Sequence, residues 1–245
     1  MAAILHRAEE RGRGDYGWLK TRYSFSFADW YEPTRMGFGA LRVINDDTIA
    51  AGQGFGPHPH RDMEIVTIVT RGTVAHQDSA GNTGVTRAGE VQVMSAGTGI
   101  VHAEANASAE EPLSLFQVWI TPREAGLVPR YVQQAFDFDA PGATLLAAPT
   151  VASGEGRAAP SEDGGALTIN QDAHITLANV AGDFAYALRD PAHGVYLFVV
   201  SGAVEIAGAT LRERDALGVT GARAVETRAP QSGARVLIFE VPMIA

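Results

Sequence analysis

The sequence contains no cysteine, and this absence excludes a disulfide framework. It suits a reducing compartment, because disulfides persist mainly in oxidising ones. The sequence also lacks any run of about 18 uncharged apolar residues, the length that a membrane-spanning helix needs. Residues 1–20 mix charges and have no apolar region of the kind found in secretory signal peptides. We therefore expect a soluble, cytoplasmic protein without a membrane partner.

Clusters of basic residues are also missing. The chain carries 19 Lys and Arg against 28 Asp and Glu, which gives a net charge of −9, and the basic residues are dispersed. Binding to phosphates needs clustered Lys and Arg side chains. We therefore expect no direct nucleic-acid partner. An acidic surface of this kind suits a protein partner, and a monomer is the default expectation.

Short strand patterns are common in the sequence, and helix patterns are sparse. Tyr23–Trp30 alternates aromatic and small residues, which predicts a half-buried strand. Phe38–Ile44 predicts a second strand, which we expect to end at the polar turn sequence Asn45-Asp46-Asp47. In His58–Val69 the second half is apolar or β-branched on both faces, as in a strand sandwiched inside a β fold. This regular spacing predicts an all-β protein of barrels or sandwiches with few short helices.

Two similar segments indicate an internal duplication. VYLFVVSGAVEIAG echoes EIVTIVTRGTVAH, with Gly202 in the place of Gly72. Between them, the sequence becomes rich in Ala, Gly, Pro and Ser as far as Gly165. We therefore predict two domains, residues 1–138 and residues 139–245.

Potential metal ligands occur in only one of the two copies. The first copy has His58 and His60, followed by His102 and Glu104. The second copy has no histidine at the matching positions, and we expect its His193, in a DPAHG turn, to be solvated.

The four side chains of the first copy have the spacing of ligands on β-strands. Residues two apart on a strand point the same way, so two neighbouring strands would offer three imidazoles and a carboxylate to one ion. Burying these groups without an ion would be costly. Without thiolates, the set excludes iron–sulfur clusters and cysteine-ligated zinc. Fe(II) is our first choice, because a six-coordinate ion keeps two positions open, and Mn, Ni, Co, Cu and Zn also suit the set.

The same stretch resembles the two motifs of the cupin superfamily. The residues that match the motifs are Gly52, His58, His60, Glu64 and Gly72 for the first, and Gly89, Gly97, His102 and Asn106 for the second. More narrowly, HPHRDMEIVT, HQDSAGN and VQVMSAGTGIVHAE resemble the pirin family, specifically its bacterial quercetinase-like branch. The resemblance extends over most of the chain. It implies a bicupin, two tandem antiparallel β-barrel or jelly-roll domains, with metal only in the N-terminal domain.

The resemblance also implies a ligand set. In pirins the ligands equivalent to His58, His60, His102 and Glu104 usually hold iron. Many cupins instead use the glutamate of the first motif, here Glu64, and spacing places Glu64 on the same face as His58 and His60. The pirin pattern favours Glu104.

The function that the resemblance implies is a metal-dependent dioxygenase that cleaves a flavonol such as quercetin with O₂. Glu104 is then the candidate catalytic base for the flavonol 3-hydroxyl. Phe55, Phe116 and Trp119 are candidates to line an aromatic pocket, although core packing is the stronger explanation for them. The alternative function is a pirin-like metal- or redox-sensing regulatory protein that acts through protein partners.

Overall fold

The computed structural model describes residues 1–150 and 165–243. Within these ranges nearly all the regular secondary structure is β-strand, and the one helical element is a short 3-10 turn, η1 (Ala8–Glu10). The predicted all-β architecture is therefore confirmed. Residues 151–164, which belong to the Ala- and Gly-rich stretch noted above, lie outside the described residues.

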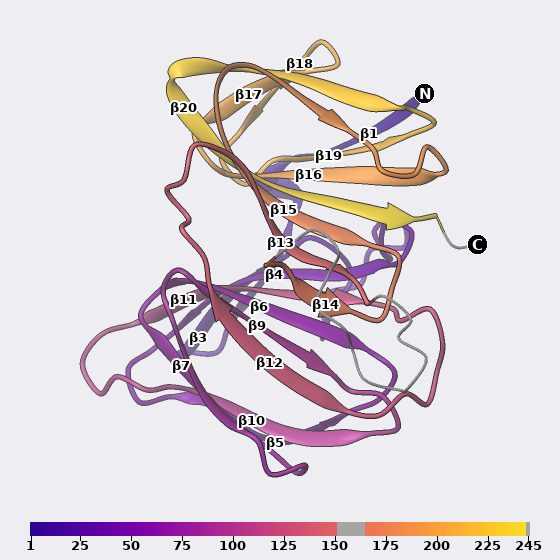
Figure 1. The fold of residues 1–245 in the computed structure, drawn as a ribbon. Coiled ribbons are helices and arrows are strands. Elements are labelled where there is room, and N and C mark those ends of the chain that lie inside the picture. Colours follow the sequence, from indigo (N-terminus) through magenta and orange to yellow (C-terminus); the bar gives the residue numbers. More distant parts are fainter. Residues whose placement is uncertain (151–164, 244–245) are drawn as a thin grey trace.

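Two antiparallel sheets form a barrel in the first half of the chain (Figure 1). The larger sheet has the order β12-β9-β6-β11-β4-β3-β2. Its strands are β2 (Gly12–Asp15), β3 (Leu19–Tyr23), β4 (Leu41–Ile49), β6 (Glu64–Arg71), β9 (Glu90–Ser95), β11 (Leu113–Ile120) and β12 (Arg130–Ala135). The smaller sheet has the order β5-β10-β7-β8. Its strands are β5 (Gly54–His60), β7 (Thr73–Asp78), β8 (Thr83–Arg87) and β10 (Ile100–Asn106).

The second half forms one nine-stranded sheet with the order β1-β19-β16-β20-β15-β13-β14, and β17 and β18 extend it beside β20. Its strands are β1 (Ala2–His6), β13 (Gly142–Pro149), β14 (Leu167–Ile169), β15 (His174–Ala187), β16 (His193–Ser201), β17 (Ala203–Ile206), β18 (Ala209–Arg212), β19 (Ala216–Thr220) and β20 (Ala224–Pro242). Gly72 and Gly202 make equivalent turns after β6 and β16, with φ angles of +78° and +79°. Strand β1 pairs with β19, so the first residues of the chain lie in the sheet of the second half (Figure 1).

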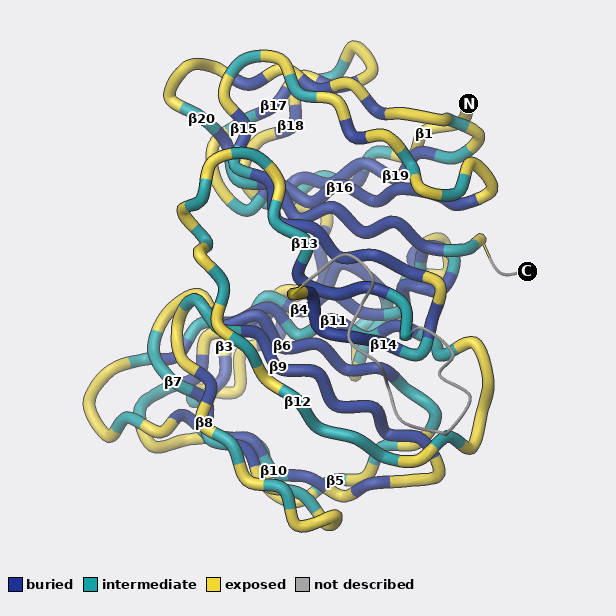
Figure 2. The backbone as a smooth tube through the Cα atoms, viewed as in Figure 1, coloured by how far each residue is buried: buried dark blue, intermediate teal, exposed yellow. Residues whose placement is uncertain are grey.

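The two halves share a hydrophobic core. Val66, Ile68 and Phe116 of the first half pack in one cluster with Tyr196 and Phe198 of the second. Figure 2 shows this buried layer between the upper and lower parts of the molecule. Strand β6 is apolar on both faces for this reason: Val66 and Ile68 face the shared core, whereas its other apolar residues face the barrel interior.

The structure corrects two of the strand predictions. The strand expected over Tyr23–Trp30 is wrong, because β3 ends at Tyr23 and the following chain turns back through a bridge between Phe27 and Trp30. The expected end of the second strand is also wrong. Strand β4 continues through Asn45-Asp46-Asp47 to Ile49, because neighbouring strands pair with it on both sides.

His193 is buried rather than solvated, with 4% of its surface exposed. It opens β16, and its backbone N–H donates to the carbonyl of Asp190. Its ring nitrogens lie 3.4 Å from Glu240 Oε1 and 3.5 Å from Asp172 Oδ2. The turn therefore ends just before the histidine, and acidic side chains surround the imidazole.

Candidate metal centre

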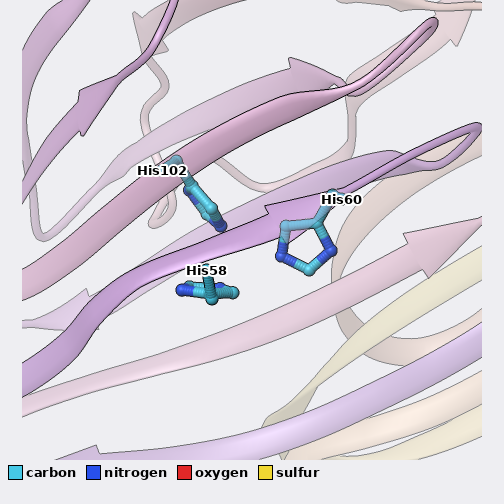
Figure 3. A group of neighbouring side chains, drawn as sticks. All are labelled: His58, His60 and His102. Atoms are coloured by element: carbon cyan, nitrogen blue, oxygen red, sulfur yellow. The ribbon is translucent and has the colours of Figure 1, made fainter.

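Three of the predicted ligands converge on one point inside the barrel. His58 and His60 lie on the same face of β5, and His102 on β10 is paired with His58 across the sheet. The ring centroids of His58 and His102 are 4.4 Å apart, and those of His60 and His102 are 4.9 Å apart. One nitrogen from each of the three rings lies within 4.8 Å of the others. In Figure 3 the three rings lie close together, with His58 and His60 on one strand and His102 on the neighbouring strand.

Glu104 lies beside this group but is displaced from it by a bulge. The register between β10 and β5 shifts between His102 and Glu104, so Glu104 pairs with Phe55 instead of continuing the series. Its carboxylate forms a second group with His102 and His76, within 4.8 Å, and is not in the three-histidine group. It accepts hydrogen bonds from Gln92 Nε2 at 2.5 Å and from Gln117 Nε2 at 2.9 Å.

Burial of Glu104 affects its protonation. Desolvation raises the pKa of this carboxyl to about 7, although the hydrogen bonds from Gln117 and Gln92 oppose the shift. The group can therefore hold or release a proton near neutral pH.

Glu64 faces away from the histidines. Its carboxylate accepts hydrogen bonds from Ser95 Oγ at 2.8 Å and from the backbone N–H of Asn170 at 3.1 Å, which belongs to the second half. The expectation that Glu64 shares a face with His58 and His60 is wrong. The chain turns at Asp62, with φ +48°, between β5 and β6, so strand alternation does not carry across.

His102 and His60 are neutral near pH 7, which is the form of imidazole that binds a metal. Burial lowers the pKa of His102 to about 3, and the nearby imidazoles of His58, His60 and His76 add to the shift. Burial likewise lowers the pKa of His60 to about 4, with His58 contributing. Neutral imidazoles offer a lone pair, so protons do not compete for these ligands near pH 7.

Two ring nitrogens are left free to bind. His102 Nε2 is buried without a hydrogen-bond partner among the described residues. His58 Nδ1 lies 2.8 Å from the carbonyl oxygen of Gly56, which can only accept, so the lone pair of His58 is on Nε2. A buried acceptor without a donor is costly, and a cation at this point would satisfy it. The residues present therefore fit a metal ion.

A chain of hydrogen-bonding groups behind His102 fixes its tautomer. His76 Nε2 lies 3.3 Å from Asp78 Oδ2, and His76 Nδ1 lies 3.5 Å from His102 Nδ1. Burial alone would raise the pKa of Asp78, but hydrogen bonds from Asn82, His76 and Ala80 together lower it. The ionised carboxylate holds the proton on His76 Nε2, so His76 Nδ1 accepts from His102 and the lone pair of His102 stays on Nε2. Tyr131 stacks on His76 at 4.3 Å and keeps the ring in place.

The histidines and Glu104 line a cavity of about 270 Å³ between the two sheets of the barrel. Phe55 and Trp119 line it as well, with Trp119 4.9 Å from the ring of His60. Phe116 does not, because it packs against Phe198 in the shared core. A mostly apolar cavity with a few convergent polar groups is the usual form of a small-molecule site.

Sequence reasoning missed several polar side chains of this cavity. They are Thr21, Asn45, Asp47 and Gln117. Asn45 and Asp47 are two apart on a strand, a spacing that would have placed both on one face. The polar composition of that segment concealed this, because it also matches a turn.

A duplicated β fold with converging histidines inside the barrel of its first half is typical of a cupin-type protein. The chain belongs to the pirin family: the family model described as Pirin matches residues 5–120, and that of the quercetinase C-terminal cupin domain matches residues 157–241.

Similar proteins cover nearly the whole chain. Quercetin 2,3-dioxygenase of Escherichia coli K12 is 44% identical over 241 residues, 98% of this chain and 99% of the relative. A pirin-like protein of Caulobacter vibrioides is 42% identical over 232 residues, 94% of this chain and 96% of the relative. The solved structure of the bacterial pirin YhhW from Escherichia coli in complex with nickel(II) has a TM-score of 0.89 and 41% identity, covering 99% of this chain and 100% of that one.

The histidine and glutamate cluster, together with the nickel(II) complex of a relative, indicates a site for a divalent metal. The names of the relatives indicate a dioxygenase. Within the described residues, no helix is long and apolar enough to cross a membrane.

Proposed function

We propose that the protein is a metal-dependent dioxygenase that cleaves a flavonol such as quercetin with O₂. The observation that carries this proposal is the convergence of three histidines in the wall of a cavity that Phe55 and Trp119 also line. The 44% identity to a quercetin 2,3-dioxygenase over nearly the full length supports the substrate class. The cytoplasmic location and the monomeric state that the sequence predicts stay predictions.

We propose His58, His60 and His102 as residues that hold the metal, and Glu104, whose carboxylate lies within 4.8 Å of a ring nitrogen of His102, as the fourth. Iron(II) is favoured, and Mn, Ni, Co, Cu and Zn suit the same donors. When bound, such an ion acts as a Lewis acid that lowers the pKa of a substrate hydroxyl.

The chain itself supplies a base and an apolar enclosure. Glu104 can accept the proton of the flavonol hydroxyl on one of its carboxylate oxygens. Gln92 and Gln117 hold that carboxylate in place through their side-chain amides. Phe55 and Trp119 offer aromatic surfaces against which the flavonol rings pack, and they limit the entry of water.

Metal analysis tests the site before any activity is measured. Purified native protein loaded with iron(II) should hold about one ion per chain. The His58→Ala and His102→Ala variants should hold far less, because each loses a ligand that no other side chain replaces. Equal metal content in native protein and both variants would refute the site.

Turnover tests the reaction. Iron-loaded protein is mixed with quercetin without oxygen, oxygen is then admitted, and the flavonol absorbance is followed against a His60→Ala control. Decay well above the control supports the proposal. Stoichiometric metal without flavonol decay refutes the dioxygenase function for this substrate and favours the metal-sensing regulatory alternative.

A further inference from the structure

We propose that Asp47 and Asn45 form a subsite in the cavity that accepts hydrogen bonds from hydroxyl groups of the substrate. The cavity would thereby select polyhydroxylated aromatic molecules over apolar ones of the same shape. This inference deepens the proposed function and rests on it for the identity of the substrate.

The two residues lie across the cavity from the histidines. Asn45 and Asp47 are on β4 in the seven-stranded sheet, whereas His58 and His102 are on the four-stranded sheet. All four side chains line the same cavity. A ligand that reaches the histidines with one end therefore meets β4 with another part of its surface.

Each of the two side chains has a buried acceptor without a partner. Asp47 Oδ1 and Asn45 Oδ1 make no hydrogen bond within the described part of the chain. Both residues are 4% exposed. Buried polar oxygens normally have a donor, and leaving one unpaired costs stability. A ligand with hydroxyl donors would satisfy both.

Apart from Thr21, its partner on β3, the neighbours of Asp47 give its carboxyl no structural role. Along the strand, Ile49 packs in an apolar cluster with Leu19 and Leu115, and Leu115 is the residue paired with Asp47 on β11. An apolar side chain at position 47 would extend that cluster. The adjacent Asp46, in contrast, forms ion pairs with Arg11 and Arg214.

The carboxyl of Asp47 is unusually hard to ionise. Burial raises its pKa to about 7, with the charge of Asp46 adding to the shift and Thr21 and Arg11 opposing it. A site that keeps such a group at a cost in stability is typical of a binding position.

Asn45 connects the subsite to the metal centre. It pairs with Gln117 on β11, and Gln117 donates to the carboxylate of Glu104. These polar side chains thus lie along one wall of the barrel, while Phe27, Phe55 and Trp119 provide the apolar lining. This arrangement suits a flat aromatic ligand with hydroxyl groups at its edge.

The test compares two flavonols that share the group directed at the metal. Quercetin carries additional ring hydroxyls, and 3-hydroxyflavone carries none of them. Binding to metal-loaded protein is measured without oxygen through quenching of tryptophan fluorescence, because Trp119 lines the cavity. Turnover of both compounds is measured separately after oxygen is admitted.

Native protein should bind quercetin about 10- to 100-fold more tightly than 3-hydroxyflavone, the range expected for hydrogen bonds to two buried acceptors. The Asp47→Leu variant should lose affinity for quercetin but not for 3-hydroxyflavone, so that the preference falls toward 1. The Asp47→Ala variant, which removes both acceptor oxygens without adding bulk, should show a reduced preference as well. It replaces Asp47→Leu as the test if the leucine variant does not fold.

Ser24→Ala is the matched control. Ser24 also has a buried hydroxyl without a partner among the described residues, but it does not line the cavity. Its removal should leave the preference unchanged.

The outcomes separate the two proposals. An unchanged preference in folded Asp47 variants overturns the subsite, and turnover of both flavonols by native protein would still support the dioxygenase. Conversely, a preference that depends on Asp47 without any turnover supports the subsite and refutes the reaction.

Discussion

Single side chains decide whether the histidines of the barrel can act as ligands. A histidine has two nitrogens, and its usefulness to a metal depends on which one carries the proton. For His102 that choice is made by His76 and Asp78 behind it, and for His58 by the carbonyl of Gly56. These two histidines and the groups that set their tautomers come from β5, β7 and β10, three strands of one small sheet.

Asp78→Asn tests the support of His102. The substitution places an amide in the position of the carboxylate and removes the acceptor that holds the proton on His76 Nε2. We expect metal affinity to fall about 10- to 100-fold, as for other groups that orient metal ligands. The measurement is a competition titration against a chelator. Gln77→Ala, at an exposed position of the same strand, is the control and should bind like native protein.

Asp47 gives a testable dependence of stability on pH. Its pKa in the folded protein, about 7, lies above the ordinary value of 3.8, so the folded state holds this proton more tightly than the unfolded state. Its contribution to the free energy of unfolding is therefore complete below about pH 4 and is lost as the pH rises through 7. The loss is on the order of 4 kcal/mol.

Urea unfolding of the metal-free protein between pH 5 and 8 measures this effect. The Asp47→Asn variant cannot ionise at this position, so its stability relative to native protein should increase with pH. A difference that stays constant across the range would contradict the raised pKa.

At the scale of elements, the geometry of the candidate metal centre depends on how closely β5 and β10 approach each other. Gly54 on β5 lies against β10, and an added Cβ would be 2.3 Å from the carbonyl oxygen of Glu104 and 2.4 Å from the Cα of Ala105. Only glycine fits between these backbones. The bulge between His102 and Glu104 adjoins this contact, so the approach of β5 sets the position of both pairs of candidate ligands.

Gly54→Ala should therefore push β5 away from β10. We expect a loss of about 1–3 kcal/mol in the free energy of unfolding, as for other overpacked sites, together with weaker metal binding. Gly56→Ala on the same strand is the control, because a Cβ there meets nothing within 4 Å. If both variants bind metal like native protein, the close approach does not position the ligands.

At the scale of the whole molecule, the two halves are joined rather than merely adjacent. They share one hydrophobic core, and β1 crosses into the sheet of the second half. Asp46 on β4 pairs with Arg11 at 3.3 Å and with Arg214 at 2.7 Å. The predicted boundary near residue 138 stays a prediction, but neither half buries its share of this core alone.

We therefore expect the full chain to unfold in one cooperative transition. The three tryptophans, Trp18, Trp30 and Trp119, all lie in the first half, so their fluorescence reports on that half alone. Far-ultraviolet circular dichroism reports on strands of both halves. The two urea curves should coincide. Separate midpoints would show that the halves unfold independently.

The sequence by itself determined the β architecture and the histidine pairs, because both follow from the alternation of side chains along single strands. Strand alternation is a local property, so it fails wherever a turn intervenes or a strand meets an unforeseen partner. Only the tertiary structure turned Glu64 toward Asn170 and buried His193. It also carried β4 through a polar segment that resembles a turn, because pairing with β3 and β11 supplied the hydrogen bonds of the backbone there. That long-range pairing is what brings Asp47 to the cavity and leaves its carboxylate facing the space that a substrate would fill.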